Sequence, residues 1–157
     1  MAFEYIKTEP THADFLVLVA ELNLSLQQIT NDSGERSFSA EAFDPEQDGC
    51  LIVYDNKEAV ACGVFRSSGN ETCELKRMYS KKSGAGSFLI KQLEVYALSK
   101  GYRRAVLSTR RVNEKAVGFY RRHAYAEIEP YGKYVGAAKS ICLGKRLNIF
   151  SHQTDES

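Results

Sequence analysis

Two short turns between three strand-like segments most strongly constrain how this chain can fold. Residues 50–55 (CLIVYD), 59–67 (AVACGVFRS) and 72–80 (TCELKRMYS) each have the composition of a β-strand. The turn-forming sequences DNKE and SGN lie between them. Connections this short join antiparallel neighbours, because a parallel crossover needs a dozen or more residues. The three segments are therefore predicted to form an antiparallel meander.

Further elements are predicted before this meander. Residues 3–8 predict a strand, and apolar residues at helical spacing predict a helix over residues 11–29 with Thr11 as its N-cap. The polar and acidic residues 31–49 are expected to form a loop, with a short helix near residues 40–43.

After the meander, the expected elements alternate between helix and strand. One helix follows the glycines and ends at Gly101, and another begins at Asn113 as its N-cap. Strands are predicted over residues 104–109, 125–131 and 140–147. This order predicts an α/β (α+β) fold with a mixed, mostly antiparallel sheet flanked by helices on both faces. We expect one domain over residues 1–150 and a polar C-terminal tail over residues 151–157.

Hydropathy and cysteine spacing exclude several classes of protein. No apolar run approaches the length that spans a bilayer, and the N-terminal residues lack the pattern of a secretory signal. A cytoplasmic protein without a membrane partner is expected. The four cysteines form no CxxC pair, so the sequence predicts buried free thiols rather than a metal site or a disulfide framework.

Charge is distributed unevenly, although the net charge is only +1. Residues 1–70 hold 4 Lys and Arg against 12 Asp and Glu, whereas residues 71–122 hold 13 against 4. This segregation predicts an anionic partner for the middle of the chain, and a solvated charged surface is the alternative. Nucleic acid is not expected as that partner, because no nucleic-acid-binding motif accompanies the basic segment.

The sequence Lys81-Lys82-Ser83-Gly84-Ala85-Gly86 lies between a predicted strand and a predicted helix. The N-terminus of a helix presents unpaired N–H groups, and glycines let a phosphate approach them closely. A plain structural turn is the alternative. No lysine follows the second glycine, as a Walker A motif requires, and the third glycine of the dinucleotide fingerprint is missing. The turn therefore matches neither an ATP nor an NAD site well.

Residues 74–109 resemble the acetyl-CoA-binding region of the GNAT N-acetyltransferase superfamily. The family signature, (Arg/Gln)-x-x-Gly-x-(Gly/Ala), is matched here by Gly84 and Gly86, with Lys81 in the position of Arg or Gln. Further along, NEKAVGFYRRHAY resembles the family segment Asn-x-x-Ala-x-x-(Phe/Leu)-Tyr-x-x-x-Gly-Phe. The residues that match this segment are Asn113, Ala116, Phe119 and Tyr120, with Ala124 and Tyr125 in place of the final Gly-Phe. The resemblance implies a GNAT-like sheet.

The resemblance also implies a function. It implies an N-acetyltransferase that moves an acetyl group from acetyl-CoA to a primary amine by direct attack in a ternary complex. The residues that it implies for acetyl-CoA binding are Met78, Tyr79, Ser80, Lys81, Lys82, Ser83, Gly84, Ala85, Gly86, Ser87, Asn113 and Tyr120. The alternative is a non-catalytic regulatory module that binds CoA or acyl-CoA. No metal is expected.

Two residues are candidates for the proton transfers of this reaction. Tyr120 matches the tyrosine that protonates the leaving CoA thiolate in many relatives, and a core aromatic role is its alternative. Glu74 lies on the strand before the glycine turn, where relatives often place a carboxylate, and is the candidate base, directly or through water. A carboxylate paired with a neighbouring Lys or Arg is the alternative. His123 is a further candidate base, or a surface histidine at a helix C-terminus.

The amine acceptor is less determined by the sequence. Arg77, Tyr131 and Tyr134 are candidate substrate-binding residues. The acidic residues between Asp32 and Asp48 would favour a cationic amine, unless they form a solvated loop. The expected acceptor is a small-molecule or protein amine, and assembly into a homodimer is compatible with the sequence.

Overall fold

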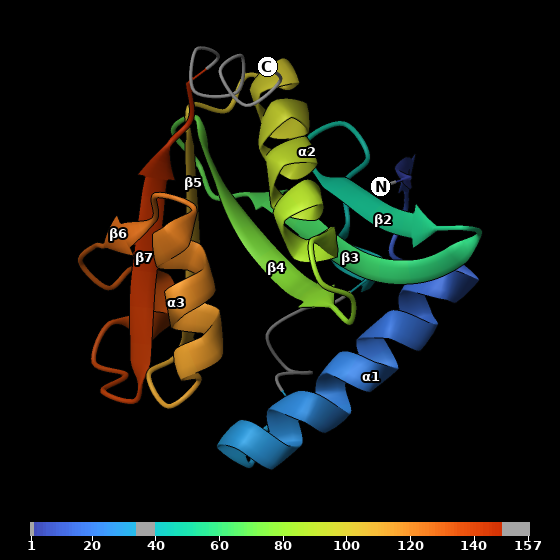
Figure 1. Ribbon diagram of the computed structural model, residues 1–157. Helices are drawn as coiled ribbons and strands as arrows, with labels where there is room; N and C mark the ends of the chain where they lie inside the picture. Colours follow the sequence, from blue (N-terminus) through green and yellow to red (C-terminus); the bar gives the residue numbers. More distant parts are fainter. Residues whose placement is uncertain (1, 34–39, 149–157) are drawn as a thin grey trace.

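The computed structural model describes residues 2–33 and 40–148 (Figure 1). Its strands are β1 (Phe3–Thr8), β2 (Gly49–Asp55), β3 (Glu58–Ser67), β4 (Thr72–Ser80), β5 (Arg104–Arg110), β6 (Ala126–Glu127) and β7 (Ser140–Arg146). Its helices are α1 (Ala13–Thr30), α2 (Ala85–Ser99) and α3 (Glu114–Arg122), with short 3-10 helices η2 (Ala40–Ala42) and η3 (Gly132–Tyr134). The predicted succession of strands and helices is confirmed, whereas the C-terminal tail predicted over residues 151–157 lies outside the described residues.

The strands form one sheet in the order β1-β2-β3-β4-β5-β7-β6. All neighbouring strands are antiparallel except β4 and β5, which are parallel. The predicted meander is therefore β2-β3-β4. Asn56 and Lys57, at the first of its turns, both have positive φ (53° and 71°), as a two-residue hairpin turn requires. The mixed, mostly antiparallel sheet is confirmed.

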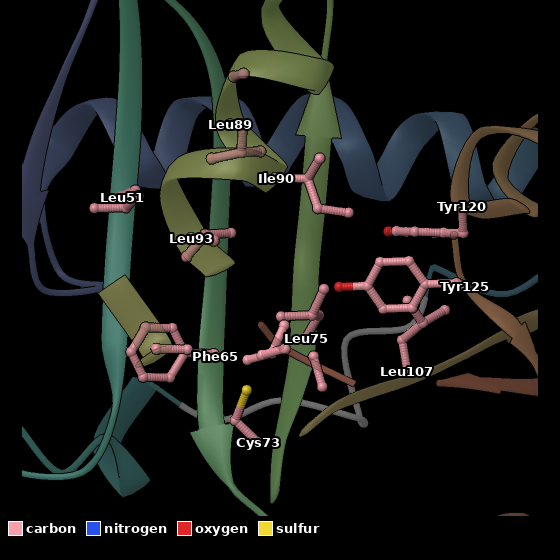
Figure 2. Packing of buried hydrophobic residues seen from close by; sticks show 14 of the residues in the cluster. Leu51, Phe65, Cys73, Leu75, Leu89, Ile90, Leu93, Leu107, Tyr120 and Tyr125 are labelled. Carbon is pink, nitrogen blue, oxygen red and sulfur yellow. The ribbon is translucent and has the colours of Figure 1, made fainter. Parts of the chain in front are cut away.

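Helices cover both faces of the sheet, as the sequence predicted (Figure 1). On one face, Leu89, Ile90 and Leu93 of α2 share a buried cluster with Tyr120 and Tyr125 from α3 and the residues after it (Figure 2). On the other face, α1 packs in a second buried cluster, which consists of Phe15, Leu18, Cys50, Ile52, Cys62 and Val64. The meander is thus enclosed between α1 and α2.

All four cysteines are buried and none is in a disulfide, which confirms the prediction of free thiols. Burial raises the pKa of both Cys62 and Cys73 to about 12. In the part of the chain that the structure describes, no helix is both long enough and apolar enough to cross a bilayer.

Element boundaries differ from the predicted ones at two places. The N-cap of α1 is His12 and not Thr11, because the His12 imidazole Nδ1 accepts a hydrogen bond from the Asp14 N–H at 3.0 Å. The strand predicted over residues 125–131 is much shorter, since β6 covers only Ala126–Glu127. Its pairing stops before Pro130, which has no N–H group to donate to β7.

Ala124 stands where the resemblance expects glycine, and its φ of 70° is in the left-handed region. An L-residue is disfavoured there by about 1–2 kcal/mol, which exceeds the entropic cost of glycine. We therefore expect Ala124→Gly to raise the free energy of unfolding by about 0.5–1 kcal/mol. Urea denaturation would show a higher midpoint with an unchanged slope.

Ala126→Gly is the matched control, because Ala126 is also exposed but lies in strand β6. It should lower the urea midpoint. A lower midpoint for both variants would contradict the account of Ala124.

Candidate functional site

The parallel strands β4 and β5 pair over only a short distance. Their register joins Thr72–Glu74 to Arg104–Val106, and no pairing between the two strands continues beyond it in the described residues. β4 continues to Ser80 and β5 to Arg110, and the two strands diverge (Figure 1). The second half of β4 therefore presents backbone N–H and C=O groups on its β5 side that the sheet does not use.

An extra residue bends β4 beside this gap. The register with β3 shifts between Cys62 and Val64, and opposite this shift Arg77 has a φ of 51°. This combination defines a β-bulge, a feature common next to functional sites. The Arg77 side chain is buried and donates a hydrogen bond to the side chain of Asn23 in α1. Its candidate role in substrate binding stays a prediction.

A pocket of about 400 Å³ occupies the gap between β4 and β5. Leu75 belongs to the cluster under α2, so its strand neighbours Glu74 and Lys76 point to the side of α1. Both line the pocket, and so do Asn113 and Tyr120 from the side of α3. The pocket thus connects the two faces of the sheet.

The glycine turn joins the end of β4 to the start of α2. Gly84 is the N-cap, with a φ of 85° and no side-chain cap on the first turn of the helix. The Ala85 N–H donates to the Lys82 carbonyl at 3.1 Å, so it is not available to a ligand as the sequence interpretation expected. Within the described residues, the N–H groups of Gly86 and Ser87 have no backbone acceptor outside the helix. An anion at this turn would bind those groups.

Gly86 has a packing role that the sequence does not reveal. A Cβ at this position would lie 3.2 Å from the Phe119 ring and 3.4 Å from Ser80 Cβ. Those distances are tight for carbon atoms, so a side chain at residue 86 would push α3 away from the first turn of α2 by a few tenths of an ångström. The glycine predicted for a phosphate site therefore also positions α3.

Both lysines of the turn are paired with acids. Lys81 Nζ lies 3.4 Å from Glu21 Oε2, and Lys82 forms an ion pair with Asp55. The hydrogen bond to Asp55 raises the pKa of Lys82. Because neighbouring acids offset these charges, anion binding at the turn would depend more on backbone N–H groups than on lysine side chains.

His123 contacts the turn rather than the pocket. Its Nε2 lies 3.0 Å from the Ser87 hydroxyl, and burial lowers the pKa of the imidazole. It is not among the described residues that line the pocket. The geometry therefore gives no support to His123 as the base.

Tyr120 is a core aromatic, as one sequence interpretation has it, and it also lines the pocket, whereas its role as the acid stays a prediction. Its ring packs edge-on against Phe119 and Tyr125, with centroid distances of 5.3 and 5.8 Å. Figure 2 shows the Tyr120 and Tyr125 hydroxyl groups directed towards β4. Among the described residues, no side chain or backbone group forms a hydrogen bond with the Tyr120 hydroxyl. Burial raises the pKa of Tyr120, so its hydroxyl keeps its proton at neutral pH.

Glu74 is surrounded by groups that interact with its charge. The Tyr131 hydroxyl donates to Glu74 Oε2 at 2.7 Å, and Lys76 Nζ lies 3.6 Å from the same oxygen. Lys76 Nζ also donates to the Tyr134 hydroxyl at 3.2 Å. The pKa of Tyr131 is raised by burial and by the negative charge of Glu74. Glu74 is therefore the paired strand carboxylate that the sequence allowed, and its role as base stays a prediction.

Asn113 has the capping role predicted for it. Its side chain accepts a hydrogen bond from the Ala116 N–H at 3.3 Å, and Asn113 also lines the pocket. The same residue therefore starts α3 and borders the site.

Of the acids in this stretch whose side chains the structure describes, only Asp32 lines the pocket. Asp32 lines the pocket but is paired with Arg110 at 2.9 Å. Asp48 is buried, and its carboxylate accepts hydrogen bonds from the N–H groups of Asp44 and Ser67. Residues 34–39 lie outside the described residues. The described acids thus give little support to a site for a cationic amine.

A buried acid behind the site was not identified from the sequence. Glu94 of α2 is only 2% exposed. It accepts a hydrogen bond from the Tyr125 hydroxyl at 2.7 Å and from Lys145 Nζ at 2.9 Å. The available signal was the position of Glu94 on the apolar face of its helix, four residues after Ile90 and three before Ala97.

Comparisons with known proteins point to one family. The family model described as "Acetyltransferase (GNAT) family" matches residues 17–125. The chain is 35% identical to "Probable N-acetyltransferase 14" of Xenopus tropicalis over 80 residues, which are 48% of this chain and 39% of that protein. The chain thus spans well under half the length of the curated relative it matches.

Solved structures show the same fold. A candidate acyl-CoA N-acyltransferase of Klebsiella pneumoniae superimposes with a TM-score of 0.79 and 24% identity, over 93% of this chain and 98% of that one. PaiA N-acetyltransferase of Thermoplasma acidophilum, in complex with coenzyme A, has a TM-score of 0.70 and 16% identity, over 93% and 99% of the two chains.

Proposed function

The chain belongs to the GNAT acetyltransferase family, and we propose on this basis that it transfers an acetyl group from acetyl-CoA to a primary amine. The observation that carries this proposal is the pocket between β4 and β5, which connects both faces of the sheet. A site with this form lets one substrate approach from the side of α2 and α3 and the other from the side of α1. Tyr120 and Glu74 line the pocket from these two sides.

The residues around the gap fit acetyl-CoA. When bound, acetyl-CoA supplies an acetyl thioester whose carbonyl carbon an amine attacks directly. The uncapped first turn of α2 offers N–H groups at Gly86 and Ser87 to the pyrophosphate. On the β5 side of β4, where strand pairing has ended, backbone groups of Met78, Tyr79 and Ser80 would bind the extended arm of the cofactor.

Tyr120 is the proposed acid of the reaction. Its hydroxyl is protonated at neutral pH because burial raises its pKa. It also has no hydrogen-bond partner among the described residues, so it is available to a ligand in the pocket. We expect it to donate its proton to the departing CoA sulfur.

Glu74 is the proposed base, directly or through water. The contacts of its carboxylate with Tyr131 and Lys76 both involve Oε2. Its other oxygen, Oε1, has no partner among the described residues. Oε1 is therefore the atom that we expect to receive the proton of the amine.

One observation favours the second candidate function, a CoA-binding regulatory module without turnover. Lys76 and Tyr131 already engage the Glu74 carboxylate, as expected for a carboxylate with a structural role. The two functions share the cofactor site and differ in turnover.

We expect acetyl-CoA to stabilise the protein. A ligand at 100 times its Kd that binds only the folded state adds about 2.7 kcal/mol, which corresponds to a rise in Tm of about 5–10 °C for a chain of this size. A thermal scan checks this, with ATP as the control that should cause no comparable rise. No rise with saturating acetyl-CoA would reject both functions.

Release of free CoA thiol in the presence of an amine panel then separates the two functions. The buried cysteines of the native protein, with a pKa of about 12 for Cys62 and Cys73, should contribute little to the thiol signal. A rise in Tm without thiol release from any amine would leave only the regulatory module.

A further inference from the structure

The part of the pocket beside α1 carries more positive than negative side chains. The charged residues that line the pocket are Asp32, Glu74, Lys76, Arg77, Arg110 and Lys133. The four cations exceed the two acids in this list, and both acids are already paired. Glu74 lies 3.6 Å from Lys76 and Asp32 lies 2.9 Å from Arg110.

Lys133 is a cation with which neither of these acids forms an ion pair. It has no ion-pair partner in the described part of the chain, and its Nζ lies 5.5 Å from the centre of the Tyr134 ring. Lys76 Nζ lies 5.7 Å from the centre of the same ring. Two ammonium groups therefore lie near the same aromatic ring. The pKa of Lys76 is lowered by burial and also by the positive charge of Lys133, which places the two groups within range of mutual repulsion.

The cofactor turn does not account for this positive charge. Lys76 precedes the end of β4 at Ser80 by four residues, a separation of up to about 13 Å along a strand. It also points to the α1 side, whereas α2 covers the other face. The two lysines of the turn have their own acidic partners.

We infer that the acceptor is a small primary amine that also carries an anionic group, a carboxylate or a phosphate, which Lys133 and Lys76 bind. This inference rests on the proposed function and specifies its substrate class. An ammonium group has three donors, so Lys76 keeps at least one for a ligand beside its contacts to Glu74 and Tyr134. The pocket volume of about 400 Å³ is in the range of small-molecule sites. An anion between the two lysines also removes their repulsion.

The first test compares matched amines in the thiol-release assay. β-Alanine is paired with propylamine, O-phosphoethanolamine with ethanolamine, and putrescine represents a cationic acceptor. In at least one pair, the amine with the carboxylate or phosphate should have a kcat/KM at least about tenfold higher than its match without that group. A charge-assisted hydrogen bond is worth that much or more. The pair that shows the larger ratio distinguishes a carboxylate from a phosphate.

Binding gives a second readout that does not depend on turnover. With saturating CoA present, the preferred anionic amine should raise Tm further, whereas its neutral match at the same concentration should not.

Variants of Lys133 test the assignment to a residue. Lys133 is exposed, so Lys133→Gln should fold normally, and it should raise KM for the anionic amine at least about tenfold without changing KM for acetyl-CoA. Lys133→Arg keeps the charge and should retain most of the affinity. Arg103→Gln is the control. It removes an exposed positive charge directly before the start of β5, and it should leave KM for the amine and KM for acetyl-CoA unchanged.

Each outcome decides between the proposals. Equal or better turnover of neutral or cationic amines would overturn the anionic acceptor and leave the acetyltransferase function intact. Acetyl-CoA binding without turnover of any amine would overturn both the anionic acceptor and acetyl transfer. An unchanged KM in Lys133→Gln would overturn the role of Lys133. Failure to bind acetyl-CoA would overturn the proposed function itself.

Discussion

Replacement of Tyr120 by phenylalanine is expected to lower kcat by about 10²-fold or more, with little change in the Kd for acetyl-CoA. A positioned general acid typically contributes 10²–10⁴-fold to a rate. The substitution removes only the hydroxyl group, and the ring would keep its edge-on packing with Phe119 and Tyr125. Steady-state kinetics and a cofactor titration measure the two effects separately.

The structure provides a matched control in a neighbouring tyrosine. Tyr125 touches the ring of Tyr120, but its hydroxyl donates to the buried carboxylate of Glu94. Tyr125→Phe should therefore reduce stability by about 1–3 kcal/mol while kcat stays near the wild-type value. Equal kcat values for wild-type and Tyr120→Phe would remove Tyr120 as the acid.

The pH profile adds an independent check on Tyr120. Because burial raises its pKa above the ordinary value of about 10, the hydroxyl carries its proton throughout neutral and mildly alkaline pH. Wild-type kcat should show no alkaline loss between about pH 7 and 9. A fall in wild-type kcat within that pH range, absent from the Tyr120→Phe variant, would show that the pKa of the Tyr120 hydroxyl is much lower than its burial implies.

Lys145→Met is expected to have the largest effect on stability, a loss of about 3–5 kcal/mol. Lys145 Nζ lies 2.9 Å from Glu94 Oε1, and the Glu94 side chain is only 2% exposed. Removal of Lys145 takes a charged partner from a buried carboxylate, which costs far more than loss of a surface ion pair. Urea denaturation measures the loss as a lower midpoint.

Two further variants establish the cause of that loss. Glu94→Gln combined with Lys145→Met removes both charges and leaves an amide oxygen for the Tyr125 hydroxyl, so stability should return to within about 2 kcal/mol of wild type. Arg111→Met removes one partner of the exposed pair with Glu127 and should cost less than about 1 kcal/mol. A Lys145→Met loss as small as that of Arg111→Met would contradict the importance of the buried pair.

The elements that the sequence predicted well are those with local causes. Short turns determine the meander, and the caps at Gly101 and Asn113 depend on residues next to them in the chain. The ends of β6 and α1 were predicted less well, because pairing near Pro130 and the His12 cap depend on competition between neighbouring groups. The short helix η3 was not predicted at all.

The position of a site residue was predictable where the residue belongs to a sequence motif. It was less predictable where the residue depends on contacts with distant parts of the chain. The resemblance to the family motifs indicated the glycine turn and Tyr120, and the structure brings Tyr120 to the pocket. The contacts of Glu74 with Tyr131, and of Lys81 with Glu21, join residues far apart in the chain. No local pattern indicates such contacts, so the positive pocket beside α1 was not expected from the acidic stretch before β2.

The two sides of the pocket also come from different segments of the chain. Lys133 and Tyr134 belong to η3 between β6 and β7, whereas the turn proposed to hold the cofactor connects β4 to α2. Insertions or exchanges between β6 and β7 would leave the glycines and their packing against α3 in place. Divergence towards new acceptors, in nature or in the laboratory, would then proceed by replacement of one surface segment, with the proposed cofactor turn unchanged.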